Sequence, residues 1–82
     1  MAGKKAAQVA VEVRDLISDF FSRTIEEDKL VEGIKEMVED YPGKIFFKDD
    51  YTATFKLHLG IQRLEEFERV YDLIQAEKEE NA

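Results

Sequence analysis

A glycine at position 60 divides the second half of the chain into two segments of different character. Residues 51–59 before it carry an apolar side chain at every second position. Residues 61–74 after it repeat apolar side chains at the three- and four-residue spacing of an amphipathic helix. Glycine is common just past the end of a helix, where the chain must turn. We therefore expect a break at Gly60 and a helix from residue 61 to about residue 77.

Two further helices are predicted in the first half of the chain. Apolar residues recur at helical spacing over residues 5–22 and again over residues 25–41. Thr24 and Glu27 form a capping-box pattern at the start of the second helix, because the threonine side chain can accept a hydrogen bond from the Glu27 amide. Pro42 ends that helix, since proline disfavours helical geometry in the residue before it.

The segment between these helices, residues 44–59, is compatible with a β-hairpin. Its alternation over residues 51–59, and its Tyr, Thr and Phe content, favour a strand that pairs with residues 44–48. A loop made of Asp49 and Asp50 would place large apolar residues on the polar face of that hairpin. A three-residue loop restores the register but lacks the glycine that such loops usually contain.

The same segment is also compatible with a helix over residues 50–59. Asp49 or Asp50 caps its start in this interpretation, and Gly60 ends it. Tyr51 then lies on the same helical face as the apolar residues one and two turns later. This interpretation needs no adjustment of register, so we favour it.

A longer pattern runs through residues 45–65. An apolar stretch is followed by lysine and acidic residues, then by a tyrosine-threonine pair, and then by a glycine that precedes Arg-Leu-Glu at the start of a helix. Its most specific positions are Tyr51, Thr52, Gly60, Arg63, Leu64 and Glu65. This pattern resembles a family of small uncharacterised proteins from Firmicutes, and in general outline the resemblance extends over residues 26–74. The resemblance implies a helix before the glycine and implies no activity.

We therefore expect one small domain over residues 1–82, folded as a compact all-α bundle of about four short helices. The expected helices are at roughly 5–22, 25–41, 50–59 and 61–77. The alternative is an α+β fold of three helices and a β-hairpin at 44–59. The chain ends, at about 1–4 and 78–82, have little to bury and are expected to fray.

The composition argues against several kinds of site. The chain has no cysteine and one histidine, His58, so a zinc ion would depend on carboxylates for most of its ligands. Adjacent carboxylates on a helix point about 100° apart and do not share one site, and no glycine-rich phosphate loop is present. We expect no enzymatic activity, no metal, no cofactor and no small-molecule ligand.

The net charge of −7 indicates which kinds of partner the chain can bind. Binding to duplex DNA depends on clustered Lys and Arg, so direct nucleic-acid binding is disfavoured. No apolar run approaches the roughly 20 residues of a membrane span, and we expect a cytoplasmic protein. The favoured function is a small acidic interaction or regulatory protein without catalysis, acting on a protein partner or as a homodimer.

Two other functions remain open. The first is a nucleic-acid-mimicking or DNA-transaction accessory protein, and the second is an enzyme that uses His58 with nearby carboxylates. For the favoured function, the partner-binding surface is predicted in the aromatic segment outside the clear helices, because a domain of this size does not cover all its aromatic residues. Its predicted residues are Ile45, Phe46, Phe47 and Tyr51.

Overall fold

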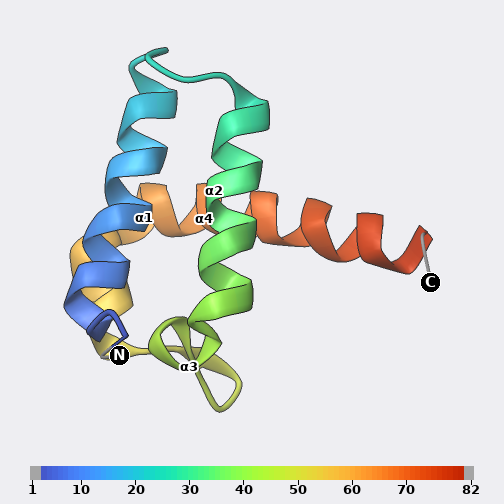
Figure 1. Ribbon diagram of the computed structural model, residues 1–82. Helices are drawn as coiled ribbons and strands as arrows, with labels where there is room; N and C mark the ends of the chain where they lie inside the picture. Colours follow the sequence, from blue (N-terminus) through green and yellow to red (C-terminus); the bar gives the residue numbers. More distant parts are fainter. Residues whose placement is uncertain (1–2, 81–82) are drawn as a thin grey trace.

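The computed structural model describes residues 3–80, which form four α-helices and one short β-hairpin (Figure 1). The elements in chain order are α1 (Ala6–Phe21), α2 (Glu27–Asp40), α3 (Pro42–Ile45), β1 (Phe46–Phe47), β2 (Asp50–Tyr51) and α4 (Ala53–Glu80). The all-α bundle of about four helices is confirmed. The hairpin of the alternative fold is also present, but it is much shorter than residues 44–59.

α1 and α2 run antiparallel, and α4 crosses both of them (Figure 1). Their apolar stripes meet in one core whose fully buried members include Val9, Val13, Ile17, Leu30, Ile34, Phe55, Leu59, Phe67 and Val70. Gly33 explains how closely α1 and α2 approach. A Cβ atom built there would lie 2.7 Å from Cδ1 of Leu16, so the absence of a side chain makes room for this leucine.

The start of α2 differs from the prediction. The Thr24–Glu27 capping box does not form, because Thr24 belongs to the end of α1 instead. Its amide donates to the carbonyl oxygen of Asp19 at 2.8 Å, and Arg23 takes a left-handed conformation with φ 64°. This is the Schellman arrangement that satisfies the last carbonyls of a helix. α2 therefore begins after Glu26, two residues later than predicted.

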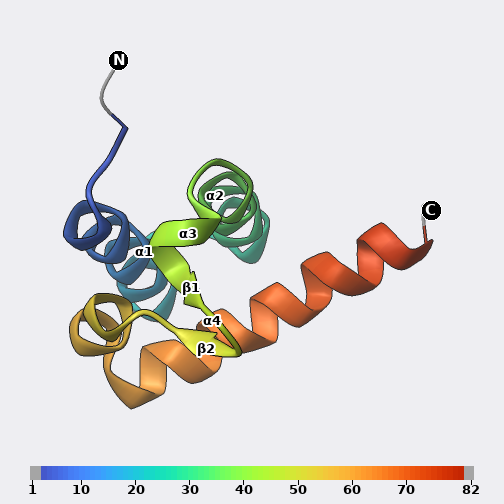
Figure 2. The same cartoon turned by 90° about the horizontal axis from the view of Figure 1, so that it is seen from below.

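The predicted break at Gly60 is confirmed as a kink inside α4, with φ 76° and ψ 171° (Figure 2). Arg63 secures the bend. Its Nη1 donates to the carbonyl oxygen of Leu59 at 3.0 Å, and its Nε donates to Oγ of Ser18 on α1 at 2.9 Å. One side chain thus caps the first half of α4 and ties the second half to α1.

The predicted helix over residues 50–59 begins only at Ala53, and the predicted caps are wrong. Asp49 and Asp50 lie in the hairpin, while Thr52 caps α4. The Oγ1 atom of Thr52 accepts a hydrogen bond from the amide of Phe55 at 3.2 Å. Threonine accepts this hydrogen bond as an aspartate cap would. Because the cap is Thr52 and not Asp49 or Asp50, the residues before it are available to form the hairpin.

The hairpin adopts neither of the two loops considered from the sequence. Phe46 pairs with Tyr51 and Phe47 pairs with Asp50, so the turn consists of Lys48 and Asp49. Lys48 has a φ of 57°, and it supplies the left-handed position without a glycine. This register places the rings of Phe46 and Tyr51 beside each other, at 5.8 Å between centroids.

The second half of α4 extends beyond the other helices (Figure 2). Ile74 is its last buried residue, but the helix continues to Glu80, three residues past the predicted end. Of the ends predicted to fray, residues 1–2 and 81–82 lie outside the described residues. Among residues 3–80, no helix combines the length and the apolar character needed to cross a membrane.

Candidate functional site: the hairpin groove

Five aromatic rings form one cluster between the hairpin and α4, contributed by Phe46, Tyr51, Phe55, Phe67 and Tyr71. The ring centroids of Phe55 and Phe67 lie 4.9 Å apart, and those of Phe46 and Tyr71 lie 5.1 Å apart. Phe55 and Phe67 are fully buried. The other three rings are half-buried, so each covers the core with one part and contributes to the surface with the other.

The four residues predicted to bind a partner are placed differently from one another. Ile45 is fully buried and offers no surface. Phe46 and Tyr51 are brought together in the aromatic cluster, and both are half-buried. Phe47 lies on the opposite face of the hairpin with 62% of its surface exposed. The Nζ atom of Lys48 lies 5.4 Å from the centre of its ring.

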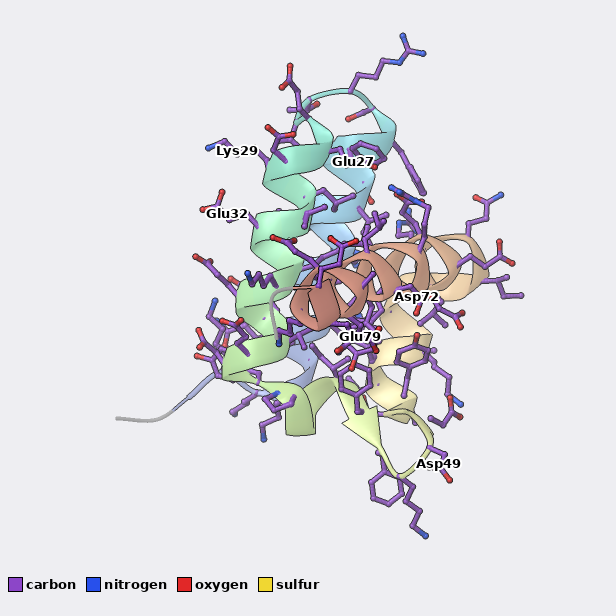
Figure 3. The ribbon with its side chains drawn as sticks, turned by 90° about the vertical axis from the view of Figure 1, so that its right-hand side faces the viewer. Glu27, Lys29, Glu32, Asp49, Asp72 and Glu79 are labelled. Carbon is purple, nitrogen blue, oxygen red and sulfur yellow. The ribbon has the colours of Figure 1, made fainter. Side chains whose placement is uncertain are left out.

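An open groove of about 630 Å³ lies over this cluster. The hairpin forms one wall and one face of α4 forms the other. Its lining residues are Phe46, Lys48, Asp49, Asp50, Tyr51, Glu68, Tyr71 and Asp72. We call it the hairpin groove. Figure 3 shows Asp72 on α4 and Asp49 at the turn of the hairpin, above and below the groove.

The α4 wall of the hairpin groove was not predicted from the sequence. Glu68 and Asp72 are four residues apart and therefore adjoin on the helix surface, with Tyr71 beside them. Like charges at this spacing destabilise a helix by a few tenths of a kcal/mol. Such a pair of acidic residues next to an aromatic residue could have indicated this wall from the sequence. It did not stand out, because acidic residues occur along the whole helix.

The hairpin groove carries a negative charge. It has one lysine against four carboxylates, a formal charge of −3. Asp50 is paired with Lys56 at 2.7 Å, and the hydrogen bond from this lysine lowers the pKa of the Asp50 carboxyl. Within residues 3–80, no ion pair is formed by Asp49, Glu68 or Asp72.

This charge affects the pKa of Tyr51, which lies at the floor of the hairpin groove. Burial raises the pKa of its phenol, and the carboxylates of Glu68, Asp72 and Asp50 raise it further, because a phenolate there would be repelled. Three carboxylates from two different elements thus act on the same ring. The electrostatic potential in the groove is negative and disfavours anions.

The opposite side of α4 contains a contrasting arrangement. Nη2 of Arg69 lies 2.6 Å from Oε2 of Glu66 and 2.8 Å from Oε1 of Glu27 on α2. These two hydrogen bonds, the one to Glu66 first, raise the pKa of Arg69. Here the acidic residues are neutralised within the chain, and the contact joins α2 to α4.

The single histidine of the chain lies apart from the hairpin groove. His58 is half-buried on the first half of α4 and does not line the hairpin groove. Among residues 3–80, no three His, Cys, Asp or Glu side chains are grouped so that they could hold a metal ion. The hairpin groove itself supplies aromatic faces, carboxylates and a phenol, which suit binding by stacking and charge.

Residues 2–72 match the model of a protein family described as a conserved hypothetical protein. The chain belongs to this family. No curated protein and no solved structure matches the chain. The matched region ends at Asp72 and so contains every residue that lines the hairpin groove. Membership of an uncharacterised family agrees with the expectation from the sequence.

Proposed function

We propose that this protein is a small acidic interaction or regulatory protein without catalysis, and that it binds a protein partner through the hairpin groove. The observation that carries the proposal is the combination of half-buried aromatic rings with carboxylates that no cation of residues 3–80 neutralises. Aromatic residues are enriched at the centres of protein interfaces. The proposed setting is the cytoplasm of a Firmicutes bacterium, in line with the resemblance noted above.

The helix and the packed core beneath the hairpin groove also suit binding. Tyr71 and its neighbours stand on α4, and Phe67 packs beneath them with its ring 6.1 Å from that of Tyr71. A site built on a helix over a packed core keeps its shape, so little conformational entropy is lost when a partner binds.

The charge of the hairpin groove favours a different protein over a second copy of the chain. In a symmetric dimer the same patch meets itself. Asp49, Glu68 and Asp72 of one copy would then face the same carboxylates of the other, and such like-charge contacts oppose association. We therefore expect a monomer in gel filtration with light scattering.

A second candidate function is supported by another surface. Asp28, Glu32 and Glu36 are exposed along α2 at four-residue spacing, which places carboxylates about 6 Å apart. Figure 3 shows Glu32 well away from Asp49 and Asp72. A row of carboxylates on a straight helix can imitate a nucleic-acid backbone toward a basic protein. Lysines at neighbouring positions weaken this row, so we place it second.

Site-specific photo-crosslinking in cells separates the two functions. A photoreactive phenylalanine analogue replaces Lys48 in the hairpin groove, Glu32 on α2, or Gln8 on the exposed side of α1 as the control. We expect a discrete product from position 48 that excess unlabelled chain suppresses, and none from position 8. A product from position 32 alone, suppressed by DNA, would support the nucleic-acid mimic. The absence of a suppressible product at position 48 would overturn the first proposal.

A further inference from the structure

The α4 wall of the hairpin groove holds two carboxylates and one aromatic face. Glu68 and Asp72 are adjacent along the helix, and Tyr71 lies between them in sequence. All of the charge on this wall is therefore negative. Since no cation of residues 3–80 pairs with it, the repulsion between the two carboxylates persists in the free protein.

The hairpin already holds two lysines of the chain through a carboxylate and an aromatic ring. The Nζ atom of Lys56 binds Oδ2 of Asp50, a groove residue, at 2.7 Å. The Nζ atom of Lys48 lies 5.4 Å from the centre of the Phe47 ring, on the face of the hairpin away from the groove. The middle of the groove, between Tyr51 and Asp72, has the same two kinds of partner, an aromatic ring and a carboxylate, without a cation from the chain.

We infer that the hairpin groove binds an arginine side chain carried by a basic segment of the protein partner. A guanidinium is planar, so it can stack on an aromatic ring while its edge donates two hydrogen bonds to a carboxylate. The ammonium of lysine lacks this flat edge and is more strongly hydrated. Tyr71 supplies the ring for stacking, and Asp72 and Glu68 supply the carboxylates. The inference rests on the proposed function and specifies its partner.

Other occupants suit the groove less well. An apolar side chain would leave Glu68 and Asp72 desolvated without a partner, which costs free energy. A metal ion would have to collect its ligands from both walls, and no suitable group of three ligands exists among residues 3–80. A phosphate or other anion would be repelled. Arginine satisfies the rings and the carboxylates at once.

Peptide titrations followed by NMR test this inference on the intact protein. Three Gly/Ser peptides are used, carrying two arginines, two lysines, or two citrullines as the uncharged analogue of arginine. We expect shifts at residues 48–51 and 68–72, binding about threefold tighter for arginine than for lysine, and no binding of citrulline. Equal binding of arginine and lysine, or shifts centred on α2, would overturn the inference.

A charge variant with a matched control sharpens the test. The double variant Glu68→Gln/Asp72→Asn should weaken the arginine peptide by about three- to tenfold. The variant Glu77→Gln/Glu79→Gln removes the same charge from the projecting end of α4, outside the groove, and should change binding much less. Equal effects of both variants would show that net charge alone governs binding, and would overturn the inference.

The two proposals fail in different ways. If crosslinking at position 48 captures a partner but the arginine peptide does not bind, the interaction function stands and the arginine inference is wrong. If the peptide binds in the groove but position 48 gives no suppressible product, the proposed function is wrong for this surface. Circular dichroism of each variant shows whether it remains folded, and the substitutions at Glu68 and Asp72 are exposed and isosteric.

Discussion

Two sides of α4 carry acidic residues with different consequences. On one side, Arg69 binds Glu66 and Glu27 and so joins α4 to α2. On the other side, Glu68 and Asp72 stand over an aromatic floor and pair with no cation among residues 3–80. Glu66 and Glu68 are only two positions apart in the sequence, yet Glu66 contributes to the fold and Glu68 opposes it slightly. Carboxylates that cost the fold stability are the ones available to a partner.

The largest loss of stability is expected when Phe67 is replaced, because its buried ring supports both sides of α4. It contacts the rings of Phe46, Tyr51, Phe55 and Tyr71, and none of its surface is exposed. Phe67→Ala should lower the free energy of unfolding by about 3–5 kcal/mol. Urea denaturation measures this, or shows an unfolded chain. A loss under 1 kcal/mol would mean that the two sides do not share this support.

The next effect distinguishes the two hairpin phenylalanines. Phe46 is half-buried against Tyr71, whereas Phe47 is 62% exposed on the other face. Phe46→Ser should lower the free energy of unfolding by about 1–3 kcal/mol, and Phe47→Ser by less than about 0.5 kcal/mol. Denaturation of the two single variants gives the comparison directly. Equal losses would contradict the placement of Phe47 outside the core.

Two smaller changes in stability, of opposite sign, test the difference between the paired and unpaired carboxylates on the two sides of α4. Arg69→Met removes two partly exposed ion pairs and should lower stability by up to about 1 kcal/mol. Glu68→Gln removes a repulsion with Asp72 and should raise stability by a few tenths of a kcal/mol. Both changes should shrink when denaturation is repeated at high salt, because salt screens exposed charges. A loss of stability in Glu68→Gln would show that this carboxylate has a partner.

The N-terminal helices could be predicted from the sequence because their signal is periodic and local. The apolar stripes of residues 5–22 and 25–41 correspond to α1 and α2, and Gly60 marked the kink of α4. The exact ends were less predictable. From the sequence, Thr24 could either end α1 or cap α2. Only the structure shows that it ends α1, through the Schellman arrangement with Arg23 in a left-handed conformation.

The hairpin and half of the groove could not be predicted in the same way. The alternation over residues 51–59 suggested a strand, but only Asp50 and Tyr51 pair, because Thr52 starts the helix immediately afterwards. Phe46 and Tyr51 were selected from the sequence as surface aromatics, and both line the groove. The opposite wall lies some twenty positions along the chain, and only the kink at Gly60 brings Asp72 over the hairpin.

The smallest effect concerns the phenol of Tyr51, whose pKa is raised first by burial and then by Glu68, Asp72 and Asp50. In Glu68→Gln/Asp72→Asn this pKa should fall toward the ordinary value of about 10 without reaching it, since burial persists. In Arg69→Met it should not fall, because that change removes a positive charge from the opposite side. Phenolic carbon shifts measured by NMR across alkaline pH resolve each tyrosine.

The sign of the linked effect on stability follows from the same pKa. Because the pKa of Tyr51 is higher in the folded chain than in the unfolded one, folding keeps the proton bound. The contribution of Tyr51 to stability is therefore complete below about pH 10 and is lost as the pH rises through the folded value. The double variant should lose less stability in this range than the wild type does. An unchanged Tyr51 pKa in the double variant would show that the two carboxylates do not act on the floor of the hairpin groove, and the contrast between the two sides of α4 would then lack its electrostatic basis.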